Sequence, residues 1–339
     1  MRKLSIPSAV ALAMLLLALV LVSLTQGAMH IPLRGSLLTL SDAFFGSAVA
    51  DLADYQRAVI LELRLPRTLL AILIGAILAQ SGAAMQGLFR NPLADPGIIG
   101  VSAGAAVGAV LALYFTDPVQ SWWAVPIGAF IAGLGTSLLI YKLAQGTNGT
   151  SVFILLLAGI AISAMAGALI GFITYLSDDT RLRDLSLWQM GSLASADGTR
   201  VWIAALAFGL LALRLQTHAA ALNTLLLGEQ EARHLGINVE RLKQELVVLV
   251  ALGVGLAVAT AGIIGFVGLV VPHCIRMLVG PSHFSLLPLS ALCGGLLLLL
   301  ADIGARLLVA PAELPVGILT ALLGGPFFVL LLLQQRQRM

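Results

Sequence analysis

Charged residues are scarce in this sequence. Only 10% of its 339 residues are Asp, Glu, Lys or Arg, whereas a soluble domain carries about 25%. So few charges cannot cover the surface of a soluble globule, and 59% of the residues are hydrophobic. The composition therefore excludes a cytoplasmic enzyme, a disordered chain and a secreted disulfide-rich domain. It predicts an all-α polytopic membrane protein.

Cysteine and lysine are also scarce. Cys274 and Cys293 lie in apolar stretches without CxxC or Cys/His spacing, so we interpret them as buried small residues rather than disulfide partners or metal ligands. None of the three lysines, Lys3, Lys142 and Lys243, follows a glycine, so the chain has no GxxxxGK[ST] phosphate-binding loop. If ATP drives this protein, the ATPase must be another polypeptide.

Long apolar runs, in contrast, are abundant. A membrane-spanning helix needs about 20 apolar residues, and the sequence predicts ten such helices in one transmembrane domain over residues 1–339. The eighth run is short and follows a glycine-rich stretch, which favours a broken or re-entrant helix. The predicted spans are residues 5–27, 63–87, 93–115, 122–143, 151–176, 199–218, 243–263, 267–280, 285–303 and 314–333.

Positive charge predicts the orientation. Arg2 and Lys3 precede the first apolar run, which we interpret as an uncleaved first helix with its N-terminus in the cytoplasm. Ten crossings then place both termini and all three lysines inside. The outer side nevertheless keeps an unusually large number of arginines, which requires a reason. The outer arginines are Arg34, Arg57, Arg64, Arg67, Arg181, Arg183, Arg200 and Arg306.

The longest inner polar segment covers residues 217–243. Within it the residues from Gly228 to Gly236 predict a short helix, because Glu229 and Arg233 complement the helix dipole and Gly236 suits a left-handed C-terminus. A helix of two turns is not stable alone. The segment is therefore either a solvated loop helix or a docking element for a cytoplasmic partner.

A small apolar face is predicted on this helix, formed by Ala232 and Leu235 three residues apart. If the helix docks on a partner, this face is the part expected to pack.

Three outer arginines flank predicted helix ends. Arg64 and Arg67 surround Pro66 at the start of the second span, where proline is tolerated, and Arg306 follows Asp302 by four residues. One interpretation is that the arginines extend toward the lipid headgroups and that Arg306 pairs with Asp302. The other is a basic outer patch that binds an acidic partner.

Six motifs are distributed from about residue 60 to the end of the chain. They are RLPRT at 64–68, GLFRNPLADPG at 87–97, WQMGSL at 188–193, the segment 228–236, GFVGLVVPH at 265–273, and the residues from Ala301 through Arg306 to the ELPVG at 313–317. Together they resemble the permeases of type II ABC importers, which take up iron-siderophores, haem and cobalamin.

The resemblance implies a ten-helix subunit that pairs as a homodimer, with the substrate path along the two-fold axis. It implies two cytoplasmic ATPase subunits, a periplasmic substrate-binding protein and a place in the bacterial inner membrane, in contact with lipid and not with nucleic acid. Transport would proceed by alternating access, with ATP used by the partner subunit and no covalently bound cofactor, metal or catalytic residue in this chain.

The resemblance also implies roles for particular residues. The arginines that match Arg64, Arg67 and Arg306 meet glutamates on the two lobes of the binding protein, which would explain the outer arginines. The short inner helix would be the coupling helix that sits in a groove of the ATPase. Its residues are Gly228, Glu229, Ala232, Arg233, Leu235 and Gly236. The cytoplasmic gates would lie at Asn91 and Leu93 and, by a loose match, at Thr150 and Ser151.

The substrate is predicted from the motifs alone. Residues 86–91, 271–273 and 280–281 are most similar to the haem-transporting branch, so we expect haem, with an iron-siderophore or cobalamin as the alternatives. A different class, an ion-coupled secondary transporter, would need acidic or histidine side chains in mid-span. Nearly all sixteen acidic residues lie in loops or at span ends, which counts against that class.

Overall fold

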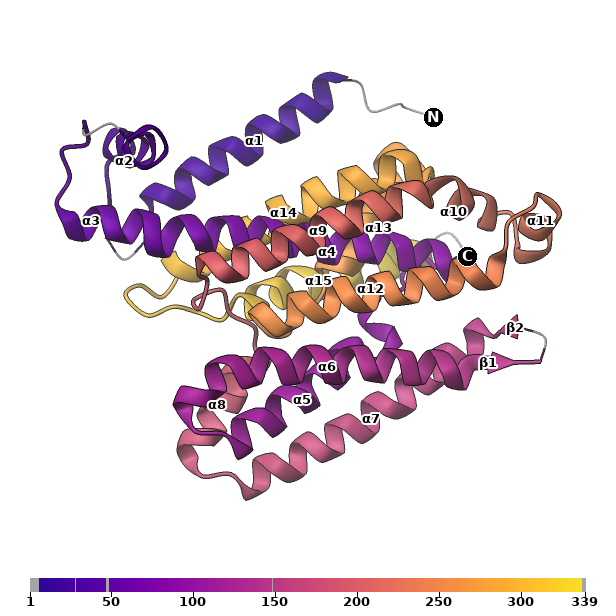
Figure 1. Cartoon of the computed structure of the whole chain (residues 1–339). Helices are drawn as coiled ribbons and strands as arrows, with labels where there is room; N and C mark the ends of the chain where they lie inside the picture. The colour runs from indigo at the N-terminus through magenta and orange to yellow at the C-terminus, as the bar shows by residue number, and fades with distance from the viewer. Residues whose placement is uncertain (1–5, 28, 47–48, 148, 337–339) are drawn as a thin grey trace.

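The computed structural model describes residues 6–27, 29–46, 49–147 and 149–336 (Figure 1). Arg2, Lys3 and Arg338, which contribute to the predicted orientation, lie outside these residues. In these residues ten apolar helices each correspond to one predicted span. They are α1 (Ile6–Thr25), α4 (Leu65–Leu88), α5 (Val101–Phe115), α6 (Pro118–Ala144), α7 (Val152–Leu176), α9 (Gly198–Thr217), α12 (Val239–Ala261), α13 (Val267–Val279), α14 (His283–Leu307) and α15 (Val316–Arg336).

Six helical segments within the described ranges are long and apolar enough to cross a membrane, and four shorter apolar helices complete the set of ten.

Short elements connect these helices. The short elements are α2 (Leu33–Phe45), α3 (Asp54–Ala58), the π-helix η1 (Val59–Arg64), the 3-10 helix η2 (Pro96–Ile99), α8 (Asp179–Gln189), α10 (Ala219–Leu225), α11 (Glu229–His234), and the strands β1 (Gln145–Gly146) and β2 (Gly149–Thr150), which pair antiparallel.

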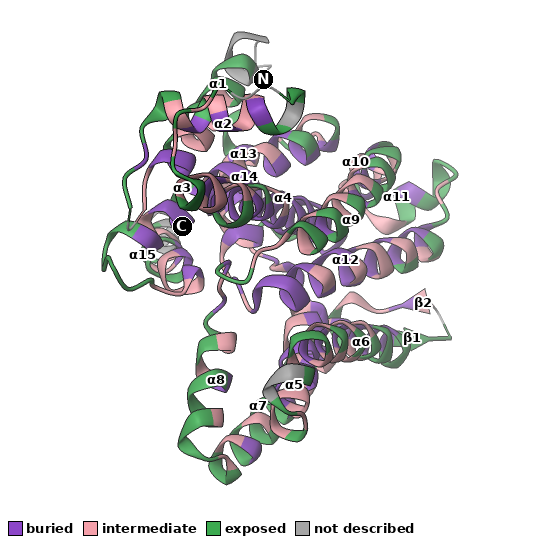
Figure 2. Ribbon diagram, turned by 60° about the vertical axis from the view of Figure 1, so that its left-hand side comes forward, coloured by how far each residue is buried: buried purple, intermediate pink, exposed green. Residues whose placement is uncertain are grey.

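Helix α4 lies at the centre of the core and packs closely against α14 and α13. A Cβ on Gly75 would lie 2.2 Å from the Gly294 carbonyl oxygen, and one on Gly82 would lie 1.7 Å from the Gly268 carbonyl oxygen. The absence of a side chain at these positions lets the helix backbones approach closely. Figure 2 shows α4, α12 and α14 mostly buried, whereas α7 and α8 are mostly exposed.

The bundle has two distinct ends (Figure 1). Helices α10 and α11 and the hairpin β1–β2 lie at one end, which we call the α11 end, and α2, α3 and α8 lie at the other, the α3 end. Helix α1 begins and α15 finishes on the side of the α11 end, as expected for ten crossings.

The second predicted span begins earlier than expected. The helical segment is continuous from Asp54, through η1, to Leu88, so Pro66 lies inside it rather than in its first turn. Proline lacks an N–H and its ring clashes with a carbonyl one turn earlier. The π-helical turn just before it, in which the Leu65 N–H bonds the Ile60 carbonyl, accommodates the ring.

Two other spans are interrupted near glycines. The third begins at Val101 rather than at residue 93, because the 3-10 turn η2 precedes it and Gly100, with φ of 76°, separates the two. The eighth is the 13-residue α13, and the residues from Gly262 to Phe266 before it are not helical. The predicted break before the eighth span is therefore confirmed.

Candidate functional site

At the α3 end, two carboxylates hold two of the predicted docking arginines. Arg67 Nε donates to Asp302 Oδ1 at 2.8 Å, and its Nη1 donates to Glu313 Oε2 at 2.6 Å. Arg306 Nε lies 3.1 Å from the other oxygen of Asp302, so the predicted Asp302–Arg306 ion pair is confirmed. One buried carboxylate therefore joins α4 to α14 and is shared by two guanidiniums.

Arg306 and Arg64 donate hydrogen bonds to the end of α1 and the residues that follow it. Arg306 donates to Ser23 Oγ at 2.7 Å and to the carbonyls of Ser23 and Gln26, both at 3.2 Å. Arg64 donates to the carbonyls of Leu24, at 2.7 Å, and of Met29. These carbonyls lie at and beyond the C-terminus of α1, where helix carbonyls lack intrahelical partners. We call Arg64, Arg67, Arg306, Asp302 and Glu313 the arginine network.

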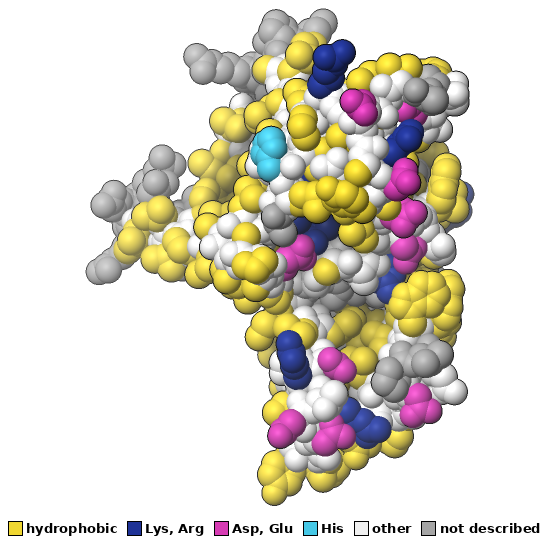
Figure 3. Space-filling view, turned by 90° about the vertical axis from the view of Figure 1, so that its left-hand side faces the viewer, with side chains coloured by type: hydrophobic (Ala, Val, Ile, Leu, Met, Phe, Trp, Pro, Cys, Tyr) yellow, Lys and Arg dark blue, Asp and Glu magenta, His cyan; other side chains and the backbone are white. Residues whose placement is uncertain are grey.

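The three arginines are buried in the described structure. Arg64, Arg67 and Arg306 are only 6%, 8% and 6% exposed. The side chains turn inward because Asp302, Glu313 and the α1 carbonyls accept their hydrogen bonds. Figure 3 views the α3 end, where Lys and Arg side chains appear singly among acidic and hydrophobic ones and form no continuous basic surface.

At the α11 end, the predicted short helix is present as α11. It has Gly228 as its N-cap, Glu229 in its first turn and Arg233 in its last, and Gly236 follows with φ of 84°, as the sequence predicts. The predicted apolar face is wrong in one respect. Ala232 is buried against the bundle, whereas Leu235, the C-cap, is 63% exposed. Leu227, which precedes the helix, is exposed as well.

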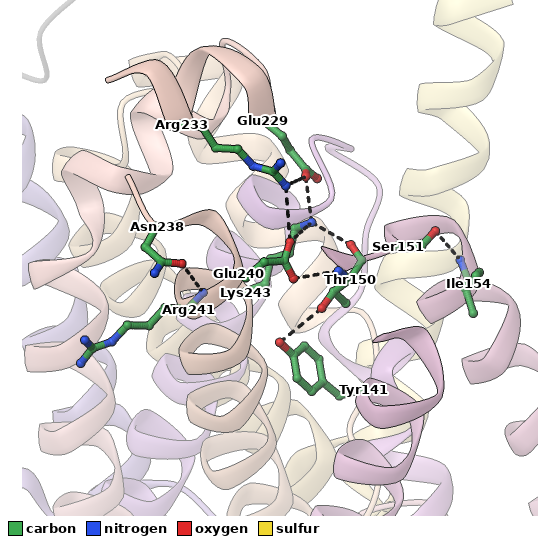
Figure 4. A network of polar contacts seen from close by, with 10 residues as sticks. All are labelled: Tyr141, Thr150, Ser151, Ile154, Glu229, Arg233, Asn238, Glu240, Arg241 and Lys243. Carbon is green, nitrogen blue, oxygen red and sulfur yellow. Dashed lines mark hydrogen bonds and ion pairs between the residues drawn. The ribbon is translucent and has the colours of Figure 1, made fainter. Parts of the chain in front are cut away.

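Beside α11, a buried lysine joins three segments of the chain (Figure 4). Lys243 Nζ, on α12, donates to the Thr150 carbonyl and to Glu229 Oε2, both at 2.8 Å, and to Glu240 Oε1 at 3.3 Å. Glu240 Oε2 in turn accepts the Thr150 N–H at 2.7 Å. Arg233 lies 3.9 Å from Glu229 and 3.7 Å from Glu240. We call Lys243, Glu229, Glu240 and Thr150 the lysine clamp.

The two predicted gates occupy different environments. Thr150 is buried and held in the lysine clamp, and Ser151 is the N-cap of α7, accepting the Ile154 N–H at 3.4 Å. Asn91 is exposed and its Oδ1 accepts the Leu93 N–H at 2.9 Å in a tight turn after α4. No hydrogen bond joins the two pairs in the described parts of the chain.

The loop that holds Asn91 ends in a helix cap. Asp95 accepts the Gly97 N–H at 2.7 Å at the start of η2. Desolvation raises the pKa of the Asp95 carboxyl, and the hydrogen bond from Gly97 opposes this shift in part. The loop also approaches α11, since Arg90 Nη1 lies 3.9 Å from the position of a Cβ on Gly228.

A cavity of about 1050 Å³ lies between the hairpin, α9 and part of α12. On the hairpin side it is lined by Gln145, Gly146, Gly149 and Thr150, and on the helix side by residues that include Arg214 and Glu240. Its polar lining and its place at the α11 end make it a water-accessible space next to the lysine clamp.

Sequence reasoning missed the role of Lys243, although a signal was present. Leu242, Leu246, Val247 and Val250 form the apolar stripe of α12, and Lys243 lies beside it at helical spacing. A lysine in such a position is expected to be buried and to need partners. Which partners it finds depends on the tertiary fold, because Thr150 is 93 residues away.

The described residues contain no group of three or more His, Cys, Asp or Glu that could hold a metal ion. Cys274 and Cys293 are free and partly buried. The stretch Gly100–Gly104 has the letters GxSxG, but it follows a 3-10 turn and begins a helix. A nucleophile elbow requires a strand before the serine, so this stretch is not one.

Comparison with known proteins gives a consistent result. The model of the FecCD transport family matches residues 15–334. The chain is 50% identical over 281 residues to the hemin transport system permease protein HmuU of Yersinia pestis, covering 82% of this chain and 84% of that protein. It is 42% identical over 282 residues to the vitamin B12 import system permease protein BtuC of Vibrio cholerae, covering 83% and 85%.

A solved structure has a similar fold. It is of an ABC transporter assigned to the metal-chelate type, in an inward-facing conformation, and superimposes with a TM-score of 0.83 at 35% identity. The match covers 96% of this chain and 98% of the other. The predicted ten-helix permease architecture is therefore confirmed.

Proposed function

Because this chain belongs to the FecCD transport family and is the permease subunit of an ABC importer, we propose that it imports haem or another iron chelate. The protein is a transport subunit and not an enzyme, and ATP hydrolysis belongs to a separate subunit. The observation that carries the choice of haem is the 50% identity to a hemin permease over most of both chains. Cobalamin is the second candidate, at 42% identity to a vitamin B12 permease.

The proposal places the α11 end in the cytoplasm, with both termini on that side. Two cytoplasmic ATPase subunits would dock there on α11, and the whole importer would contain two copies of this chain in the bacterial inner membrane. The exposed side chains of Leu227 and Leu235 support the docking role, because they flank α11 and have no cover at the end of the bundle.

Docking of a periplasmic binding protein at the α3 end is a further part of the proposal. Since the arginine network is buried, a partner glutamate would reach Arg67 only at the edge where Glu313 lies, and Glu313 is 43% exposed. Glu313 would therefore compete with the partner for Arg67. Replacing Arg64 or Arg67 with an acidic residue would break the fold as well as docking, so charge reversal is an unsuitable test.

Glu313→Gln is the suitable variant for docking. It removes the competing charge and leaves Asp302 paired, so the Kd of the binding protein should decrease relative to the parent complex. Surface plasmon resonance on the complex in nanodiscs measures this. An unchanged or larger Kd would contradict docking at Arg67.

Gating is proposed for Asn91 and Leu93 and for Thr150 and Ser151. The position of both pairs at the α11 end, one after α4 and the other before α7, supports a role in closing the cytoplasmic side of the path.

Transport by the reconstituted importer tests the proposal as a whole. The chain would be placed in proteoliposomes with its ATPase and binding protein, and uptake of haem, cobalamin and a ferric siderophore would be compared with and without ATP. We expect ATP-dependent uptake, greatest for haem. Uptake that persists without any ATPase would instead indicate a secondary transporter, and preference for cobalamin would overturn the choice of substrate.

A further inference from the structure

We propose that Lys243 is the positioning residue through which movement of α11 reaches the start of α7. This inference rests on the proposed function, because it assigns a route by which the ATPase would act on the cytoplasmic gate within this chain. The two elements that the clamp connects, α11 and the β1–β2 hairpin, are both small. α11 has six residues, and the hairpin that leads into α7 has strands of two residues each.

The ammonium group of Lys243 is fully used. It has three N–H donors and three acceptors, one each on the hairpin, on α11 and on α12 itself. The side chain is 3% exposed, so water does not replace these partners. A buried ammonium group without hydrogen-bond partners is energetically unfavourable. The three acceptors are therefore kept close together around Lys243 Nζ.

Glu240 makes the attachment to the hairpin two-sided. Its carboxylate accepts the Thr150 N–H while Lys243 donates to the Thr150 carbonyl, so both peptide groups of one residue are held. The next residue, Ser151, is the N-cap of α7. A displacement of Thr150 therefore displaces the first turn of α7.

Apart from the clamp, the hairpin is held to α6, where Thr150 Oγ1 donates to Tyr141 Oη at 3.4 Å and the Ser151 N–H to the Ala144 carbonyl at 3.0 Å. In the part of the chain that the structure describes, the only hydrogen bonds between residues 145–150 and α11 or α12 are those made by Lys243 and Glu240. The cavity of about 1050 Å³ beside the hairpin leaves it room to move on the side that faces α9. The lysine clamp is thus the polar connection between α11 and α7, and the space around it permits motion.

The matched variants are Lys243→Met and Lys142→Met. The first keeps the apolar part of the buried side chain and removes all three contacts. The second removes an exposed lysine in the last turn of α6 that has no part in the clamp. We expect Lys243→Met to retain ATP hydrolysis in the full importer and to lower the substrate moved per ATP about tenfold, within the range of mutational coupling effects. Lys142→Met should match the parent.

A second pair of variants tests the same connection without removing a buried side chain. Glu229→Gln removes the charge that Lys243 contacts on α11, together with the 3.9 Å pair to Arg233, on a side chain that is 27% exposed. Glu245→Gln removes the charge that pairs with Arg241 and contacts His218, and neither contact reaches the clamp. Glu229→Gln should also lower the substrate moved per ATP, whereas Glu245→Gln should not. If Lys243→Met does not assemble, Glu229→Gln decides alone.

The outcomes are distinguishable. If both Lys243→Met and Glu229→Gln move as much substrate per ATP as the parent, the inference is overturned while the proposed function stands. If the parent complex itself shows no ATP-driven uptake, the proposed function fails, and the assignment of Lys243 fails with it.

Discussion

The arginine network and the lysine clamp lie at opposite ends of one bundle and differ in what they join. The arginine network connects α1, α4 and α14, and α4 and α14 already pack backbone to backbone at Gly75 and Gly294. The lysine clamp connects a six-residue helix, a short hairpin and the start of α12 beside a cavity. Buried charge thus holds fixed helices together at one end and links small elements at the other.

The two sites also differ in how their carboxylates meet water. Asp302 is 0% exposed, whereas the side chains of Glu229 and Glu240 are 27% and 37% exposed. A fully buried charge that loses its partner remains desolvated, which is unfavourable. A charge at the edge of a cavity can be solvated by water instead. We therefore expect mutations to act on folding at the α3 end and on coupling at the α11 end.

The largest effect is expected for Asp302→Asn. It leaves Arg67 and Arg306 buried without a charged partner in common, so the free energy of unfolding should fall by about 3–5 kcal/mol. Thermal unfolding of the purified protein in detergent measures this. Glu313→Gln, which breaks a half-exposed pair of the same network, should cost only about 0–1 kcal/mol. Equal losses for the two variants would contradict the distinction between buried and exposed partners.

A smaller loss of stability is expected for Lys243→Met. The carboxylates left behind are partly exposed and can hydrate, and the Thr150 carbonyl loses one hydrogen bond, so the loss should be about 1–2 kcal/mol. The same unfolding assay places the variant between the parent and Asp302→Asn. If Lys243→Met proved as destabilising as Asp302→Asn, the clamp would stabilise the fold as the arginine network does, and the two sites would not differ in this respect.

Gly149→Ala should strain the clamp without removing a charge. Gly149 has φ of 104°, and a Cβ there would lie 2.7 Å from Glu240 Oε1. The backbone strain should cost about 1–2 kcal/mol locally, and the substrate moved per ATP should fall by about threefold. Gly146→Ala is the matched control, because its Cβ would meet no atom closer than 3.6 Å. A normal transport ratio in Gly149→Ala would argue that the position of Glu240 does not matter.

The smallest effect is expected for Arg233→Gln. Arg233 is half-exposed and lies 3.7 Å and 3.9 Å from the two clamp glutamates. Such pairs contribute about 0.5 kcal/mol or less and are screened by salt. Substrate moved per ATP should therefore change by less than about twofold at low salt, and not at all at high salt. A loss as large as that of Lys243→Met would assign Arg233 to the clamp.

Local sequence patterns were sufficient for the helices and not for their polar contacts. The apolar runs predict all ten long helices, and the cap and dipole residues predict α11, because these signals act within a few residues. The early start of the second span at Asp54 was not predicted, since Pro66 indicates a helix start unless a π-helical turn precedes it.

The orientation of the buried side chains could not be read from the sequence. Arg67 finds Asp302 at a separation of 235 residues, and Arg306 finds Ser23 at 283. A charge pattern shows that such residues need partners, but only the fold shows whether these lie in the same chain or in another. This is why the sequence left two interpretations of the three arginines open, and why the partners of Lys243 were not predicted.

Whether the lysine clamp moves α7 can be measured by the thiol-modification rate of Ser151→Cys in the assembled importer, corrected for the native Cys274 and Cys293 in the parent. We expect the rate to differ between the nucleotide-free and ATP-bound states. In the double variant with Lys243→Met, that difference should vanish while ATP hydrolysis continues. The same ATP-dependent difference in both proteins would show that α7 moves without the lysine clamp, and Lys243 would then have no role in coupling.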